Sequence, residues 1–128
     1  MSDNPRTPHP KALPNYQKAE IPPDKLTKYA LNPTHTTQVW EKSSGKDKAR
    51  VFKSALGFGQ ADWALLKERI LAELPYHEAI LGREDQYGRR YNVTLPITGL
   101  NGNTANVLTA WIILEGTDTP TLTTTFCV

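Results

Sequence analysis

Hydrophobic side chains recur at helical spacing in the first half of the chain, and this pattern predicts three helices, over about residues 23–31, 44–56 and 62–74. Proline at residues 33 and 75 and glycine at residue 57 end them, because proline cannot continue a helix and glycine adopts the left-handed conformation that often follows one. Residues 34–43 show no period and are predicted to form a loop. The expected inward-facing residues are Leu26, Tyr29 and Ala30, then Val51, Phe52, Ala55 and Leu56, and finally Trp63, Leu66 and Ile70.

In the second half of the chain the period changes from 3.6 to 2 residues. Residues 91–97 alternate between apolar and polar side chains, which predicts a strand with one buried face. Residues 105–114 are apolar on both faces, as in a central strand, and Gly99–Asn103 carries a hairpin signal between the two. Residues 122–128, rich in threonine, predict a last strand, and a weaker signal predicts a strand over residues 77–81. The sequence therefore predicts an α+β domain, with N-terminal helices packed on a roughly four-stranded antiparallel sheet.

Proline placement sets the domain boundary. Six of the ten prolines lie in the first 23 residues, where they exclude a regular element. Residues 1–20 are therefore predicted to form an extended linker or arm, and residues 21–128 a single domain of ordinary size. Such an arm fits a domain attached to something longer, and a disordered tail is the alternative.

Composition removes several classes of protein. No apolar run approaches the ~20 residues of a membrane span, and no apolar region typical of a signal peptide stands at the N-terminus. One cysteine excludes an internal disulfide framework and a thiolate zinc cluster, and three histidines make a dedicated metal enzyme a poor fit. The chain contains no Walker loop, nucleophile elbow or zinc-protease motif. We predict no metal and no cofactor.

The net charge of +2 hides a basic cluster at residues 42–53. This cluster contains one acid, Asp47, and five cations: Lys42, Lys46, Lys48, Arg50 and Lys53. Cations near a helix N-terminus oppose the helix dipole, so helix stability alone does not select them. They suit a site where backbone amides and lysines face the same phosphate. The alternative is the solvated face of a surface helix.

A second basic cluster occupies residues 82–91, where a predicted loop enters a strand. Arginine forks bind phosphates in a bidentate manner, and tyrosines can stack on bases. We therefore predict RNA contacts for Arg83, Tyr87 and Arg90 here, and for Lys42, Arg50 and Lys53 in the first cluster. The alternative is an ordinary hairpin loop, in which Glu84 and Asp85 pair with the arginines.

Catalysis of RNA cleavage without a metal needs a base for the 2′-OH, a cation for the phosphorane and a donor for the leaving oxygen. His35 is the histidine predicted to lie in a loop beside the basic helix. Lys46 or Lys48, together with Arg89, could stabilise the charge, and Thr109 in the central strand could supply a hydroxyl. These five are the predicted catalytic residues.

Five segments in order, LNPTH, GKDKARVFKSALGF, EDQYGRRYNV, ITGLNGNTANVLTAWII and DTPTLTTTF, resemble a small bacterial domain family of uncharacterised type. Such domains occur alone and at the C-terminal tips of secreted polymorphic and contact-dependent growth-inhibition toxins. The order of helices followed by an antiparallel sheet also resembles the barnase/EndoU/colicin-nuclease/RelE-like (BECR) superfamily of ribonuclease toxins. The similarity covers residues 13–128, and KARVF and YGRRY are its specific parts.

This resemblance implies a metal-independent ribonuclease that acts on tRNA, delivered from a larger secreted protein into the cytoplasm of a target bacterium. A cognate immunity protein is the implied partner, with a host translation factor in some systems. Two alternatives come from other classes: a non-catalytic module that uses the same basic surface to bind an acidic partner or nucleic acid, and a phage-related accessory protein.

Overall fold

The computed structural model describes residues 6–32 and 45–128 and confirms the α+β class. The two α-helices are α1 (Gly45–Leu56) and α2 (Trp63–Glu73), and shorter helical segments are η1 (Tyr16–Lys18), η2 (Lys25–Ala30), η3 (Gln60–Asp62) and η4 (Leu74–Tyr76). The strands are β1 (Ile80–Asp85), β2 (Gly88–Thr98), β3 (Thr104–Leu114) and β4 (Thr121–Cys127). None of the helices in this part of the chain is long and apolar enough to cross a membrane.

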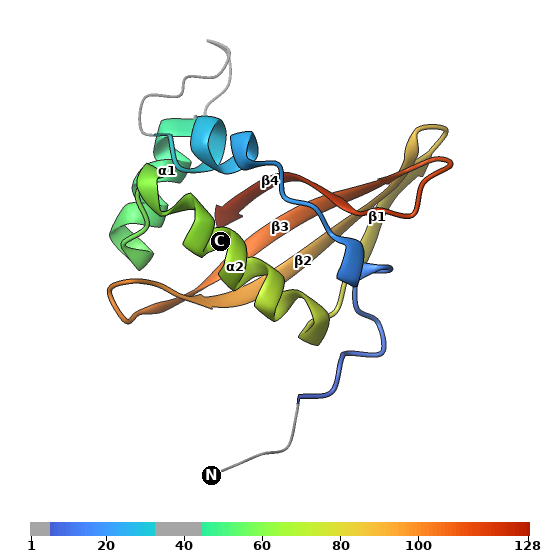
Figure 1. Cartoon of the computed structure of the whole chain (residues 1–128), viewed down its shortest axis with the longest axis horizontal. Helices are drawn as coiled ribbons and strands as arrows, with labels where there is room; N and C mark the ends of the chain where they lie inside the picture. Colours follow the sequence, from blue (N-terminus) through green and yellow to red (C-terminus); the bar gives the residue numbers. More distant parts are fainter. Residues whose placement is uncertain (1–5, 33–44) are drawn as a thin grey trace.

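The four strands form one antiparallel sheet in the order β1-β2-β3-β4, which confirms the predicted four-stranded antiparallel sheet. α2 and the N-terminal segment cross one face of this sheet (Figure 1). Side chains alternate in and out along β2, as the period of 2 predicts, and residues from α1 and α2 complete the core. The main contributors are Phe52, Leu56, Leu66, Ile70, Tyr91, Val93, Leu95, Ile97, Val107 and Trp111.

Two residues expected to face inward do not. Tyr29 is 47% exposed because η2 is a π-helix, in which Leu31 N–H bonds to Leu26 O, so the spacing of its inward residues differs from that of an α-helix. Val51 is 43% exposed because the buried stripe of α1 runs through Ala49 and residues 52 and 56 instead. The helices themselves were predicted correctly, but these two positions on them were not.

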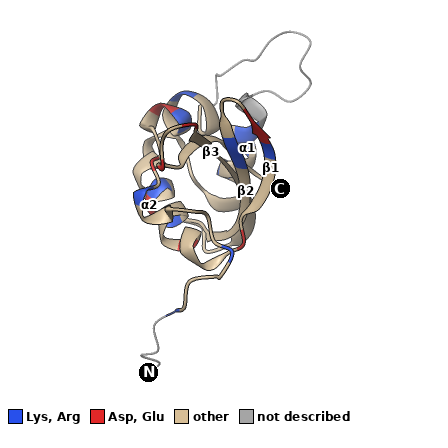
Figure 2. Ribbon diagram, turned by 90° about the vertical axis from the view of Figure 1, so that its right-hand side faces the viewer, with Lys and Arg blue, Asp and Glu red and all other residues tan. Residues whose placement is uncertain are grey.

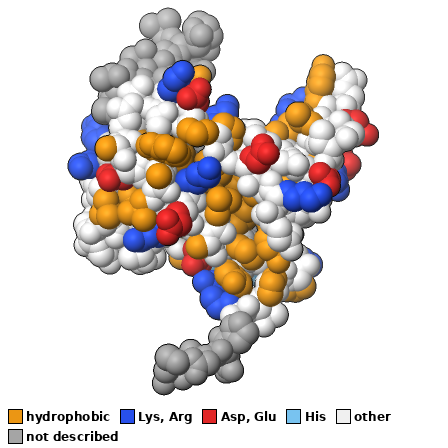
Figure 3. Space-filling view, in the orientation of Figure 1, with side chains coloured by type: hydrophobic (Ala, Val, Ile, Leu, Met, Phe, Trp, Pro, Cys, Tyr) orange, Lys and Arg blue, Asp and Glu red, His pale blue; other side chains and the backbone are white. Residues whose placement is uncertain are grey.

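The second basic cluster is not a loop. β1 begins three residues later than predicted and continues to Asp85, so residues 82–91 form most of a β-hairpin. This hairpin projects beyond the helices (Figure 1), and the surface of the projecting part carries both basic and acidic side chains (Figure 3). The arginines of the cluster are therefore fixed on strands.

The predicted arm packs against the domain throughout its described part, residues 6–20. Its backbone bonds to the segment after α2, with His9 N–H donating to Pro75 O at 2.9 Å. Leu13 is 1% exposed and belongs to the core, and Glu20 bridges Thr121 at the edge of β4. The prolines do exclude regular structure here, apart from the short turn η1, but they do not detach the segment from the domain.

The β2–β3 loop fixes the C-terminus of α1. Gly57 has a φ of +79°, the left-handed conformation predicted for the residue that ends this helix. Asn101, from the hairpin loop, donates its backbone N–H to Leu56 O at 3.4 Å and its side-chain amide to Ala55 O at 3.2 Å. Because the loop satisfies two carbonyls that a helix end leaves unpaired, it holds α1 against the sheet.

Candidate nucleic-acid interface

α1 presents its cations on two flanks. Arg50 and Lys53 are three positions apart in the helix, which places them on one flank, and Lys48 lies on the other. Together with Lys46, the helix holds four cations against a single acid, Asp47. The Lys and Arg positions of α1 are coloured blue on the ribbon in Figure 2. The structure thus places two of the residues predicted to contact RNA, Arg50 and Lys53, on one surface.

A cavity of about 640 Å3 opens beside this flank. Its lining comes from the end of η2, from α1 and from the segment that leads into α2: Leu31, Ala49, Arg50, Lys53, Ser54, Phe58, Gly59 and Gln60. The apolar members are buried, whereas the charged and hydroxyl-bearing members are exposed. The cavity therefore has an apolar inner wall and a polar rim.

Lys53 stands at this rim. A Cβ added to Gly59 would lie 3.7 Å from Lys53 Nζ, so the ammonium group is beside the backbone of Gly59. The Gly59 N–H itself donates to Asp62 Oδ2 at 2.8 Å. Within residues 6–32 and 45–128 Lys53 forms no ion pair, so its charge is available to an anionic ligand.

Lys48 has a different environment. It is half-buried, and its Nζ lies 5.1 Å from the centroid of the Phe126 ring in β4, within the range of a cation–π contact. This contact places Lys48 at the edge of the sheet, on the opposite flank from Arg50 and Lys53. Lys48 therefore contacts the sheet. It belongs to the same helix as residues that line the cavity but does not line the cavity itself.

The arginines of the β1–β2 hairpin share one carboxylate. Arg83 Nε lies 2.9 Å and Arg90 Nη1 3.2 Å from Asp85 Oδ2. The pKa of Asp85 is lowered, first by the hydrogen bond from the Tyr87 backbone N–H and then by the two arginines. The alternative interpretation paired the arginines with Glu84 and Asp85, and the pairing of two of them with Asp85 is observed. Tyr87, at the tip of the hairpin, is 60% exposed.

Two predicted catalytic residues come from the sheet. Arg89 is exposed and donates to the Tyr91 hydroxyl at 3.4 Å. Thr109 is fully buried: its hydroxyl donates to Val93 O at 2.7 Å and accepts the Trp111 indole N–H at 2.8 Å. Because both hydrogen bonds lie within the core, this hydroxyl is not accessible to a phosphate, which corrects the prediction for Thr109.

The predicted catalytic residues do not all converge. Lys48 lies over Phe126, whose partner on β3 is Leu108, whereas the partner of Arg89 is Ile113. These two partners are five positions apart on β3, about 16 Å of strand. Lys48 and Arg89 thus belong to different parts of the sheet. Two further predicted residues, His35 and Lys42, lie outside the described residues, as does the side chain of Lys46.

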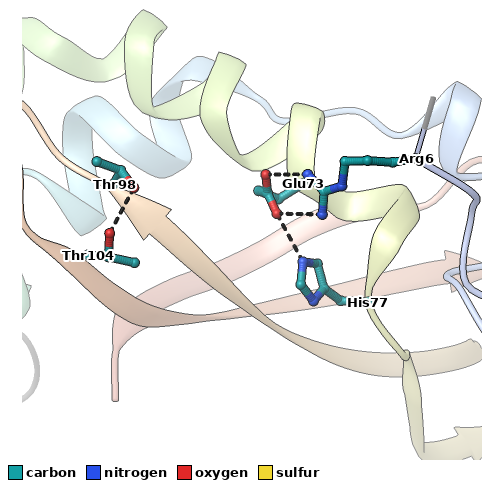
Figure 4. A network of polar contacts seen from close by, with 5 residues as sticks. All are labelled: Arg6, Glu73, His77, Thr98 and Thr104. Carbon is teal, nitrogen blue, oxygen red and sulfur yellow. Dashed lines mark hydrogen bonds and ion pairs between the residues drawn. The ribbon is translucent and has the colours of Figure 1, made fainter. Parts of the chain in front are cut away.

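A further polar cluster joins the N-terminal segment to the end of α2 (Figure 4). Arg6 donates to both carboxylate oxygens of Glu73, at 2.9 and 3.2 Å, and His77 Nε2 lies 2.9 Å from Glu73 Oε1. The Arg6 guanidinium also stacks 3.9 Å from the centroid of the Tyr76 ring. Sequence analysis missed this cluster because the arm was expected to be detached, although the i, i+4 spacing of Glu73 and His77 was visible.

The cluster predicts a pH-dependent contribution to stability. Hydrogen bonds from Arg6 lower the pKa of Glu73 below 4.5, against the smaller opposing effect of burial. The stabilisation is therefore complete above the unfolded value and is lost as the pH falls through the lowered folded pKa. Glu73→Gln is expected to cost about 1 kcal/mol at pH 7. Urea unfolding of both proteins between pH 7 and pH 3 should show this difference shrinking with acidification, and a constant difference would contradict the assignment.

Nearly the whole chain matches a known family: the model of the family described as "Domain of unknown function (DUF6883)" covers residues 12–128. No curated protein and no solved structure matches. The matched region begins within the N-terminal segment, one residue before the buried Leu13, in agreement with the packing of that segment against the domain.

Proposed function

We propose, from the premise that the chain belongs to the DUF6883 family, that the domain binds RNA along α1 and cleaves it as a metal-independent ribonuclease. The observation that carries the RNA contact is the basic flank of α1 beside a cavity with an apolar wall. Cations on one flank of a helix can follow a phosphate backbone, whose charge supplies most of the affinity in such complexes.

The biological setting comes from the sequence resemblance to ribonuclease toxins. It includes tRNA as the substrate, delivery from a larger secreted protein into the cytoplasm of a target cell, and neutralisation by an immunity protein. A host translation factor belongs to the same proposal. His35, Lys46 and Lys48 are its catalytic candidates, and Arg89 lies too far from Lys48 to act at the same phosphate.

Incubation of the whole chain with total bacterial tRNA in EDTA tests the activity. Discrete fragments are expected, and His35→Ala and Lys48→Ala should each abolish them while the melting temperature stays nearly unchanged. Intact tRNA, with and without a translation extract, combined with no toxicity on cytosolic expression, would overturn the ribonuclease proposal. A variant that loses its fold together with activity would identify a structural residue instead.

Lys53→Gln tests the RNA contact separately from cleavage. Loss of one phosphate contact is expected to weaken tRNA binding about three- to tenfold and to reduce the salt slope by about 1. Lys11→Gln is the matched control, because it removes an equal charge from an exposed position on the N-terminal segment, away from α1. Equal effects of the two variants, measured by fluorescence anisotropy across a salt series, would mean that α1 is not the contact surface.

The separation of Lys48 from Arg89 favours one alternative, a non-catalytic module that binds nucleic acid or an acidic partner through α1. A binding surface needs cations but no acid–base residue. For this alternative we expect the domain to bind tRNA, Lys53→Gln to weaken this binding, and no cleavage to occur under any of the conditions above.

A further inference from the structure

We propose that the cavity beside α1 binds a single nucleotide, with the base against its apolar wall and the phosphate on Lys53. This inference rests on the proposed RNA function and specifies what the RNA places there. A basic flank alone would bind a phosphate backbone that passes over the surface. The cavity adds a reason for one nucleotide to leave the strand and enter the protein.

The size and the lining of the cavity suit such an occupant. Its volume of about 640 Å3 lies inside the range of roughly 300–1,000 Å3 in which small-molecule sites fall. Most of the lining surface is apolar, and Leu31, Ala49 and Phe58, each at most 4% exposed, form its floor from three separate segments. A planar base gains from such contact, because removing apolar surface from water is favourable whatever the base identity.

Charge decides between a nucleotide and a purely apolar ligand. Lys53 Nζ is held at the rim beside Gly59 without an ion-pair partner in the described part of the chain. Arg50 lines the same side, one turn before it. An apolar ligand would leave this charge unused, whereas a nucleoside monophosphate places its phosphate on the rim while its base occupies the interior.

Gln60 provides a polar contact inside the same lining. Its side-chain Nε2 donates to Thr27 O at 2.6 Å, which fixes the amide against η2 and leaves its carbonyl oxygen as an acceptor. Every nucleic-acid base carries at least one N–H that can donate to such an oxygen. The cavity therefore combines an apolar wall, one oriented acceptor and a cationic rim.

Ser54→Trp is the blocking variant. Ser54 lines the cavity but is exposed, and its hydroxyl makes only a 3.5 Å bond to Val51 O, so an indole can fill the space without entering the core. Val51→Trp is the matched control, since Val51 is an exposed residue of the same helix that does not line the cavity. Lys53→Gln provides a second variant that removes charge without adding bulk.

The experiment titrates the whole chain with adenosine 5′-monophosphate, adenosine and inorganic phosphate, each followed by amide NMR. The monophosphate is expected to bind at least about tenfold more tightly than either half and to shift the amides of Ser54, Gly59 and Gln60. Ser54→Trp should weaken the monophosphate at least about tenfold, and Val51→Trp should leave it unchanged. Lys53→Gln should weaken the monophosphate but not adenosine.

Three results would overturn the nucleotide site. Inorganic phosphate or adenosine could bind as tightly as the monophosphate, or neither Ser54→Trp nor Lys53→Gln could weaken the binding of the monophosphate. Titration of the same proteins with tRNA separates this inference from the proposed function. If Ser54→Trp binds tRNA as tightly as the wild type does, the nucleotide site is contradicted but the RNA function is not. Absence of tRNA binding by a protein that still binds the monophosphate would remove the RNA function alone.

Discussion

Replacement of Gly99 by alanine is expected to cost about 3 kcal/mol or more of the free energy of unfolding. A Cβ at this position would lie 2.0 Å from Leu56 O and 2.6 Å from Leu56 C, far inside contact distance. Because these are backbone atoms, no side-chain rotation can relieve the overlap, and either α1 or the β2–β3 loop has to move. Urea unfolding followed by circular dichroism measures the loss.

Gly102→Ala is the control within the same loop. Gly102 has a φ of +83°, but a Cβ there would meet nothing within 4 Å. Its replacement is expected to cost only the strain of a left-handed alanine, about 1 kcal/mol. Equal losses in the two variants would mean that the loop does not press against α1 as described.

The same substitution links the fold to the candidate site. Gly99 and Asn101 hold the C-terminal turn of α1, and Lys53 lies in that turn. If the loop positions the basic flank, Gly99→Ala should weaken tRNA binding even at temperatures where the protein remains folded, and Gly102→Ala should not. The position of a basic surface is thus set by a contact between residues more than forty positions apart in the sequence.

The strands could be predicted because their period of 2 survives in the sequence. Over residues 91–98 β2 alternates between buried and exposed residues, and it is also the strand with the clearest alternation of apolar and polar types. The pattern also predicts β3 as a strand, but both faces of this strand are apolar, so the pattern does not indicate which face Thr109 occupies. That is why a core threonine was predicted to be catalytic.

The candidate site also contains features that could be predicted from the sequence and features that could not. The cations of α1 could be predicted from the sequence, since they are local and lie at helical spacing. The cavity could not, because Leu31, Lys53 and Gln60 meet only after three separate segments pack together. The pairing of Asp85 with arginines of the hairpin could be anticipated as an alternative, since hairpin neighbours are close in sequence.

Leu13 is the residue that local patterns conceal most completely. It is the only leucine, isoleucine or valine in residues 1–20, and one large aliphatic side chain has no period. Burial here arises from the path of the segment between α2 and β4, where Pro75 and Thr121 both contact it. Only long-range packing identifies residues 13–20 as part of the domain.

Leu13→Ala is accordingly expected to cost about 2–5 kcal/mol of the free energy of unfolding, the range for a fully buried leucine whose cavity does not collapse. Lys18→Ala is the control on the same segment. It breaks the ion pair with Asp118, but both side chains are more than half exposed, so the expected loss is much smaller than that of Leu13→Ala. Thermal and urea unfolding of both variants distinguish a packed segment from a linker. A linker would tolerate both changes equally, and its amides would exchange with solvent at the rate of an unfolded chain. A segment anchored by Leu13 should instead protect the Glu20 N–H from exchange, because this group bonds to Pro120 O.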